Sequence, residues 1–174
     1  MLETLTEVGS DASWLPVKEG PSGGTGKECN QGTEQLKGHW YLPFVKNGIN
    51  YVDAQGKDVI SFNFTGCIMA TYTPNGGSRR VCHVSTGSQQ DCKAEWDKIK
   101  QSSKNVKEFK PSDAIDPKML AGKALKGCYG IITSDDRCFA VVVGVGKDGK
   151  ATIVAKMAMS GSTATTPGTP SATR

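Results

Sequence analysis

Residues 62–87, FNFTGCIMATYTPNGGSRRVCHVSTG, contain two apolar segments separated by the turn-forming residues PNGG. The segments CIMATYT and RRVCHVST are rich in β-branched and aromatic residues, so they predict two antiparallel strands joined in a hairpin. The same stretch holds Cys67 and His83, and the length of the loop decides whether they share a face. Pro74 has no N–H to close a two-residue turn. We therefore expect an odd-length loop or a bulge in this hairpin, with Cys67 and His83 on one face and an imidazole nitrogen within reach of the sulfur.

The rest of the chain is patterned mostly as strands. Further strands are predicted at 39–45, 49–53, 58–64, 128–134, 137–145 and 151–159. The turn-like AQGK predicts a hairpin between 49–53 and 58–64, and short turns join the last three strands in a meander.

Two helices are predicted outside the strands. In QDCKAEWDKIKQSSK, Cys92, Trp96 and Ile99 form an apolar stripe with helical spacing. A shorter helix is expected in DPKMLAGKALK, with Asp116 as N-cap and Pro117 at its first position. Together these elements predict an α+β fold, a mostly antiparallel β-sandwich with one or two external helices.

Composition divides the chain of 174 residues into three parts. Residues 1–36 are rich in Gly, Ser and Glu, and we expect a loosely ordered segment. The GGTGK within it is not a phosphate-binding loop, because Pro21 and Glu28 stand where that motif needs Gly and Ser or Thr. Residues 37–159 are the expected catalytic sandwich domain, and the low-complexity residues 160–174 are expected to be disordered.

Charge and hydropathy restrict the partners. The net charge of +4 comes from scattered lysines without aromatic interleaving, which argues against nucleic acid as a partner. No stretch is apolar enough to insert into a membrane, and the N-terminal residues lack the apolar region of a secretory signal. We expect a monomer that is exported by a specialised route and acts in the cytosol of a target cell.

The six cysteines are either paired in three disulfides or present as free thiols. An even number permits three disulfides, but nothing in the sequence indicates an oxidising compartment. No C-x-x-C pair is present, which disfavours a structural zinc site.

The residues before Cys67 suggest that it is a nucleophile. In a continuous strand, Ser61, Asn63, Thr65 and Cys67 would line one face, with Phe62 and Phe64 on the other. A cysteine attacks as its thiolate, and a nearby imidazole is the usual means of lowering the thiol pKa.

Other residues near this stretch have simpler interpretations. His39 is the rival histidine, and it is expected to pack at the start of a strand. Cys82 points away from His83 into the core, and Arg79 and Arg80 are expected to be solvated at the hairpin tip.

A Gly-Cys followed 16 residues later by His resembles the cysteine glutamine deamidases. That superfamily includes the catalytic domain of cytotoxic necrotizing factor, Burkholderia lethal factor and the chemoreceptor deamidase. Its toxins carry Leu-Ser-Gly-Cys where this chain has Phe64-Thr65-Gly66-Cys67, and some members have Thr six residues before the Cys, where Ser61 stands.

The resemblance implies a toxin or effector that converts a glutamine of a target protein to glutamate. Cys67 and His83 would be the catalytic residues, with Ser61 or Thr65 as an orienting third residue. No metal or organic cofactor is needed, and the target would be a host GTPase or translation factor. Two alternatives remain open: a cysteine peptidase or amidase with the same dyad, and a non-enzymatic secreted binding module with three disulfides.

Overall fold

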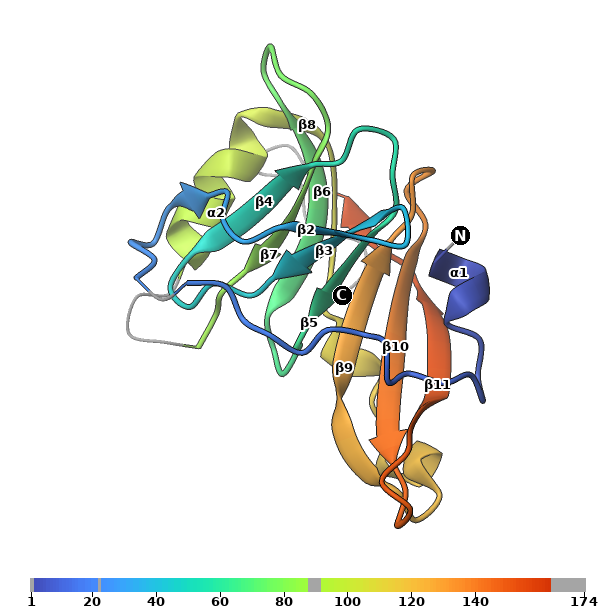
Figure 1. The fold of residues 1–174 in the computed structure, drawn as a ribbon. Helices are drawn as coiled ribbons and strands as arrows, with labels where there is room; N and C mark the ends of the chain where they lie inside the picture. Colours follow the sequence, from blue (N-terminus) through green and yellow to red (C-terminus); the bar gives the residue numbers. More distant parts are fainter. Residues whose placement is uncertain (1, 22, 88–91, 164–174) are drawn as a thin grey trace.

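The structure is a computed structural model that describes residues 2–21, 23–87 and 92–163. Its strands form two six-stranded sheets (Figure 1). The hairpin sheet contains, in spatial order, β1 (Glu28–Cys29), β4 (Ile49–Asp53), β7 (Arg80–Val84), β6 (Ile68–Pro74), β8 (Ser103–Phe109) and β12 (Ser162–Thr163). The meander sheet contains β11 (Ala151–Met159), β10 (Cys138–Val145), β9 (Ala124–Ile132), β5 (Val59–Phe62), β3 (His39–Pro43) and β2 (Glu34–Leu36).

The predicted α+β class is confirmed. Most strand pairs are antiparallel, including the predicted hairpin β6–β7 and the predicted meander β9–β10–β11. The pairs β1–β4 and β3–β5 are parallel, so both sheets are mixed. The finer description as a regular sandwich stays a prediction.

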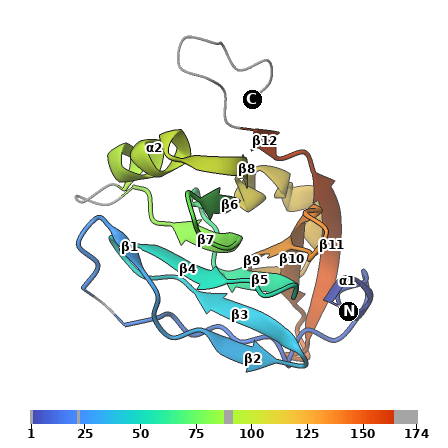
Figure 2. The ribbon, with the colours of Figure 1, turned by 90° about the horizontal axis from the view of Figure 1, so that it is seen from above.

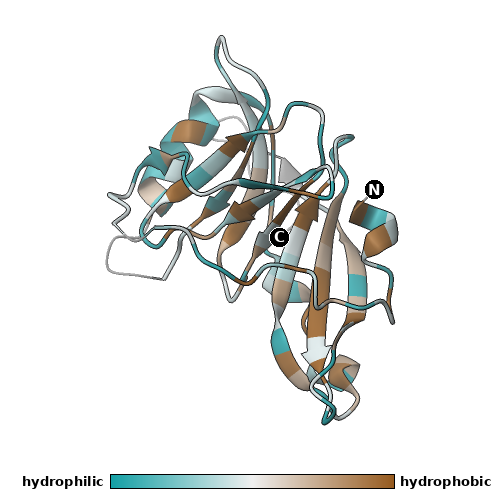
Figure 3. Cartoon of the chain, in the orientation of Figure 1, coloured by the Kyte–Doolittle hydropathy of each residue, from teal (hydrophilic) through white to brown (hydrophobic). Residues whose placement is uncertain are grey.

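Both sheets contribute to one shared hydrophobic cluster. Met69 and Val81 of the hairpin sheet lie in the same cluster as Leu42, Ile132 and Val142 of the meander sheet. Such apolar burial is the main favourable contribution to folding. Figure 3 shows that β10 is hydrophobic over most of its length, whereas the turn that follows it is hydrophilic.

Helix α2 (Lys93–Gln101) covers the outer face of the hairpin sheet (Figure 2). The predicted stripe is confirmed, because Cys92, Trp96 and Ile99 are all buried against this face. The sequence prediction missed β8, which follows the helix directly. This strand is mostly polar, because only Val106 and Phe109 are buried, and its sequence therefore gives no strand pattern.

The predicted hairpin between 49–53 and 58–64 is wrong. Both strands exist, but β4 pairs with β1 and β7 while β5 pairs with β3 and β9 in the other sheet. All four residues of β5 are buried, because both faces of this strand are covered: Val59 lies in the shared cluster, and Ile60 and Phe62 lie in the cluster on the outer face of the meander sheet. The AQGK turn therefore predicts that the chain reverses its direction, but it does not predict which strands β4 and β5 pair with.

The second predicted helix is a single turn of 3-10 helix, η2 (Pro117–Leu120). Asp116 caps it as predicted, accepting a hydrogen bond from the Lys118 N–H, and Pro117 follows. The turn ends because Ala121 adopts a left-handed conformation with φ of 48° before Gly122.

Residues 2–21 and 23–36 form some regular structure. They contain α1 (Leu2–Leu5), β1 and β2, and Leu2 and Leu15 are buried on the outer face of the meander sheet. Apolar side chains that cover this face explain the order. Of the C-terminal segment expected to be disordered, β12 pairs with β8, and 164–174 lie outside the described residues.

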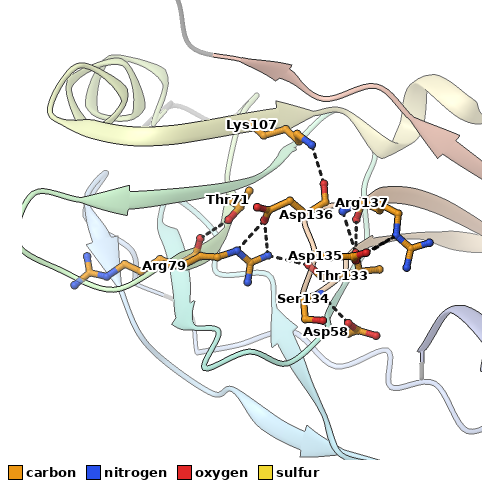
Figure 4. Close-up of polar contacts among 10 residues, drawn as sticks. Asp58, Thr71, Arg79, Lys107, Thr133, Ser134, Asp135, Asp136 and Arg137 are labelled. Carbon is orange, nitrogen blue, oxygen red and sulfur yellow. Dashed lines mark hydrogen bonds and ion pairs between the residues drawn. The ribbon is translucent and has the colours of Figure 1, made fainter.

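Arg79 links the two sheets instead of being solvated as expected. Its guanidinium donates to Asp136 Oδ1 at 2.8 Å and to the Thr133 carbonyl at 2.9 Å, in the β9–β10 turn (Figure 4). Lys107 of β8 donates to the Asp136 carbonyl at 2.8 Å. Arg80 is also paired, with Glu28 at 3.1 Å. Both arginines are half-buried, which explains why they need partners.

We predict that Arg79→Met lowers the free energy of unfolding by about 1–2 kcal/mol, because Asp136 loses its ion pair and the Thr133 carbonyl keeps only the Asp136 N–H as a donor. Urea titration measures the change. Lys98→Met on the exposed face of α2 is the matched control, and it should change stability little. Equal stability of the two variants would show that the contact between the sheets contributes nothing.

Candidate active site

The β6–β7 hairpin places Cys67 and His83 close in register but not directly opposite. The loop between the strands is residues 75–79, so the predicted odd length is confirmed. Met69, not Cys67, pairs with His83, and Cys67 precedes the first residue of β6. Cys67 lies in the shared cluster with Phe64, on which the His83 ring stacks. The two residues therefore face the same core.

The predicted polar row before Cys67 is wrong, because β5 ends at Phe62 and alternation stops there. Phe64 packs on His83, on the side where Ser61 lies. Asn63 accepts a hydrogen bond from the Cys128 N–H at 3.0 Å, and Thr65 is exposed. Of the two candidate third residues, only Ser61 contacts His83.

Ser61 fixes the protonation of the imidazole. Its hydroxyl donates to the Leu42 carbonyl at 2.6 Å and lies 2.7 Å from Nδ1 of His83. A hydroxyl has one proton. Because that proton points to Leu42, Nδ1 must carry the hydrogen that joins it to Ser61. The neutral ring therefore has its free lone pair on Nε2.

The Nε2 atom of His83 is buried and has no hydrogen-bond partner among the described residues. The ring lies between Phe64, stacked at 4.1 Å, and Phe44 at 5.1 Å. Burial lowers the pKa of His83 to about 3. The imidazole is therefore neutral near pH 7, with an unpaired acceptor in an apolar enclosure.

Cys67 is 7% exposed, and burial raises the pKa of its thiol. The main-chain N–H and the hydroxyl of Thr86 act on the sulfur in the opposite direction. The preceding Gly66 has φ of 140°, a conformation that side chains rarely adopt, and a Cβ there would meet nothing within 4 Å. Backbone conformation rather than close approach explains this glycine.

The thiolate–imidazolium pair expected from the sequence is not formed in this structure. Nδ1 of His83 is bonded to Ser61 and Nε2 has no partner, so no hydrogen bond joins the ring to Cys67. The raised pKa of the thiol and the lowered pKa of the imidazole both favour neutral groups. The structure thus joins Ser61 to His83 by a hydrogen bond and places the Cys67 thiol in the cluster whose Phe64 stacks on the ring.

The rival residues occupy other places. His39 is buried at the start of β3, where burial lowers its pKa and the charge of Asp58 opposes this. Cys82 packs under α2 on the outer face of the hairpin sheet, as predicted. The six cysteines, all among the described residues, form no disulfide, so the structure contradicts the three-disulfide alternative.

Sequence reasoning missed three residues that build the site. Phe44 covers the imidazole, and Thr86 lies at the thiol. Asn50 pairs with His83 across β4 and β7, and its side-chain amide donates to the Pro43 carbonyl at 2.9 Å, just before Phe44. Of these three, only Thr86 could have been suspected from the sequence, because it is a small polar residue just beyond the strand that carries His83.

No family model, curated protein or solved structure matches this chain. In the part of the chain that the structure describes, no helix has the length and apolarity to cross a membrane.

A cavity of about 610 Å³ beside α2 is lined by Ile68, Trp96 and Lys100 among others, but by neither Cys67 nor His83. The candidate site is therefore a buried group of side chains at the start of β6.

The lowered pKa of His83 predicts acid sensitivity. The unfolded state binds a proton below the ordinary pKa of 6.5, and the folded state does so only near 3. The free energy of unfolding should therefore decrease as the pH falls from about 6.5, with a slope approaching about 1.4 kcal/mol per pH unit. Denaturant titrations between pH 7.5 and about pH 4 measure this.

His83→Gln should lose most of this slope, and His39→Gln should lose less, because His39 is shifted in the same direction but carries a charge partner. An unchanged slope in His83→Gln would show that the imidazole titrates normally in the folded protein.

Proposed function

We propose that this chain is a protein glutamine deamidase of the toxin or effector type. Cys67 is the nucleophile, Nε2 of His83 is the base and then the acid, and Ser61 orients the ring. The resemblance to the cysteine glutamine deamidases predicts these roles, and the contacts of His83 support them.

The observation that carries the proposal is the free lone pair on Nε2. A buried nitrogen without a partner costs free energy, so its persistence suggests a use. Ser61 and Leu42 hold the tautomer in which that nitrogen can accept a proton. Catalytic contacts are often long in unliganded structures and shorten with substrate, so the missing contact to Cys67 is consistent with the role.

Burial favours a side-chain amide as the substrate over a main-chain amide. Cys67 is almost completely buried, and the flanking residues of an extended chain would collide with its surroundings. A glutamine carboxamide stands on two methylene groups and can reach below the surface. This favours deamidation over the peptidase alternative.

The chemistry moves a proton through Nε2 of His83 twice. Nε2 takes the thiol proton while the sulfur attacks the carboxamide carbon, and His83 returns that proton to the departing nitrogen, which leaves as ammonia. A water then attacks the thioester carbon and gives a proton to Nε2, and His83 passes this proton to the sulfur as the C–S bond breaks. The thiol is restored and the product is glutamate. An amine in place of water would give transglutamination.

The partner is a target protein with an exposed glutamine, a host GTPase or translation factor by resemblance. We propose delivery by a specialised export route and action in the cytosol of the target cell.

We predict that the wild-type protein, incubated with a lysate of the target cell, converts a glutamine to glutamate in at least one protein. The conversion adds about one mass unit and releases ammonia without cleavage of the chain. Peptide mass spectrometry identifies the glutamine. Cys67→Ser should abolish the conversion with unchanged thermal unfolding.

Ser61→Ala and Ser61→Thr form a matched pair for the orienting role. Ser61→Ala leaves Nδ1 without its acceptor and should lower the rate roughly 10–100-fold, whereas Ser61→Thr keeps the hydroxyl and most of the rate. Full conversion by folded Cys67→Ser, or cleaved chains instead of ammonia, would overturn the proposal.

A further inference from the structure

One end of the meander sheet is strongly basic. We call residues 116–126 and 144–152 the basic tip, because η2 and the adjoining ends of β9, β10 and β11 project there beyond the hairpin sheet (Figure 1). The tip contains two aspartates and five lysines, a surplus of three positive charges, whereas the whole chain carries +4. The lysines are Lys118, Lys123, Lys126, Lys147 and Lys150. Most of the net charge of the protein is therefore gathered at this end.

The lysines of the basic tip are not neutralised by neighbours. Within the described ranges, none of the five forms an ion pair. Lys126 is half-buried and the other four are exposed. Lys123 donates to the hydroxyl of Thr152 at 3.0 Å, which leaves its charge uncompensated. The tip therefore presents several ammonium groups to a partner.

The acidic side chains at the tip are engaged by the main chain of their own turns. Asp116 accepts a hydrogen bond from the Lys118 N–H and Asp148 from the Lys150 N–H, each at 3.0 Å. Asp11, which forms a bridge to the tip, accepts from the N–H and the hydroxyl of the residue two positions further along. These carboxylates stabilise turns instead of pairing with the lysines.

Leu125 is a large apolar side chain among these lysines, and it is 46% exposed. It lies opposite Gly144 of β10, which in turn lies opposite Thr152 of β11, so it belongs to the row in which the three strands end. Lysines beside an exposed apolar side chain are typical of surfaces that bind at the membrane interface, where the cations attract anionic headgroups and the apolar group enters the boundary below them. An acidic protein segment would account for the lysines alone.

We propose that the basic tip binds the surface of membranes that contain anionic phospholipids. The lysines contact the headgroups, and Leu125 enters the boundary between headgroups and acyl chains. The contact is peripheral and uses only the projecting end of the sheet. It is independent of the proposed function, because the tip contains neither Cys67 nor His83.

The test is sedimentation of the full chain with vesicles of phosphatidylcholine, alone or with about one third phosphatidylserine. The protein should sediment with the anionic vesicles and stay in solution with the neutral ones. Salt at about 0.5 M should release it, because the headgroup charges are then screened. Lys147→Gln together with Lys150→Gln should lower the affinity for anionic vesicles roughly 10-fold, and Leu125→Ala should lower it roughly 3-fold.

Lys98→Gln together with Lys104→Gln is the matched control, because it removes the same charge from exposed lysines outside the tip. Its affinity should stay within about twofold of the wild type, and thermal unfolding should be unchanged in all variants. Equal losses in the two double variants, or equal sedimentation with both kinds of vesicle, would overturn the proposal. Binding to polyglutamate through Lys147 and Lys150, without binding to anionic vesicles, would overturn it in favour of an acidic protein partner.

Discussion

A chain of two hydrogen bonds, from His83 Nδ1 to Ser61 and from Ser61 to the Leu42 carbonyl, crosses the shared core between the sheets. It joins β7 of the hairpin sheet to β5 and β3 of the meander sheet. An imidazole among phenyl rings would otherwise leave both nitrogens without partners, at a cost of several kcal/mol. The two hydrogen bonds satisfy one nitrogen, fix the tautomer, and leave Nε2 of the ring as an open acceptor.

The Cys67 thiol and the His83 imidazole are therefore held neutral. Burial raises the pKa of the thiol and lowers that of the imidazole, so a permanent ion pair is unfavourable here. In the proposed mechanism, charge separation follows the arrival of a substrate, when the sulfur and Nε2 approach and a proton moves. Thr86 and the tightly packed rings of Phe44 and Phe64 form the environment in which that charge develops. A resting thiol in such a site is protected from nonspecific modification.

Local signals in the sequence predicted the local structure well. The strand pattern around the PNGG turn gave the β6–β7 hairpin, its odd loop, and the opposite faces of Cys82 and His83. The stripe of Cys92, Trp96 and Ile99 gave α2. The meander followed from its short turns.

What depends on contacts between distant residues was not predictable. The AQGK turn does not say that β4 and β5 enter different sheets, because partner choice is decided by the shared core. The expected alternation of side-chain direction over residues 61–67 stops where β5 ends, and Phe64 therefore lies beside His83. Ser61 was a candidate from resemblance, but its bond to Leu42, which fixes the tautomer, appears only when β3 lies parallel to β5.

The tautomer of His83 is the most direct test of this account, and nitrogen-15 NMR of the imidazole measures it. At neutral pH the account predicts a neutral ring with a protonated Nδ1 and an unprotonated, pyridine-type Nε2. Ser61→Ala should weaken that preference. A ring protonated at Nε2, or an imidazolium at neutral pH, would contradict the account, because no free base would then face the core that contains Cys67.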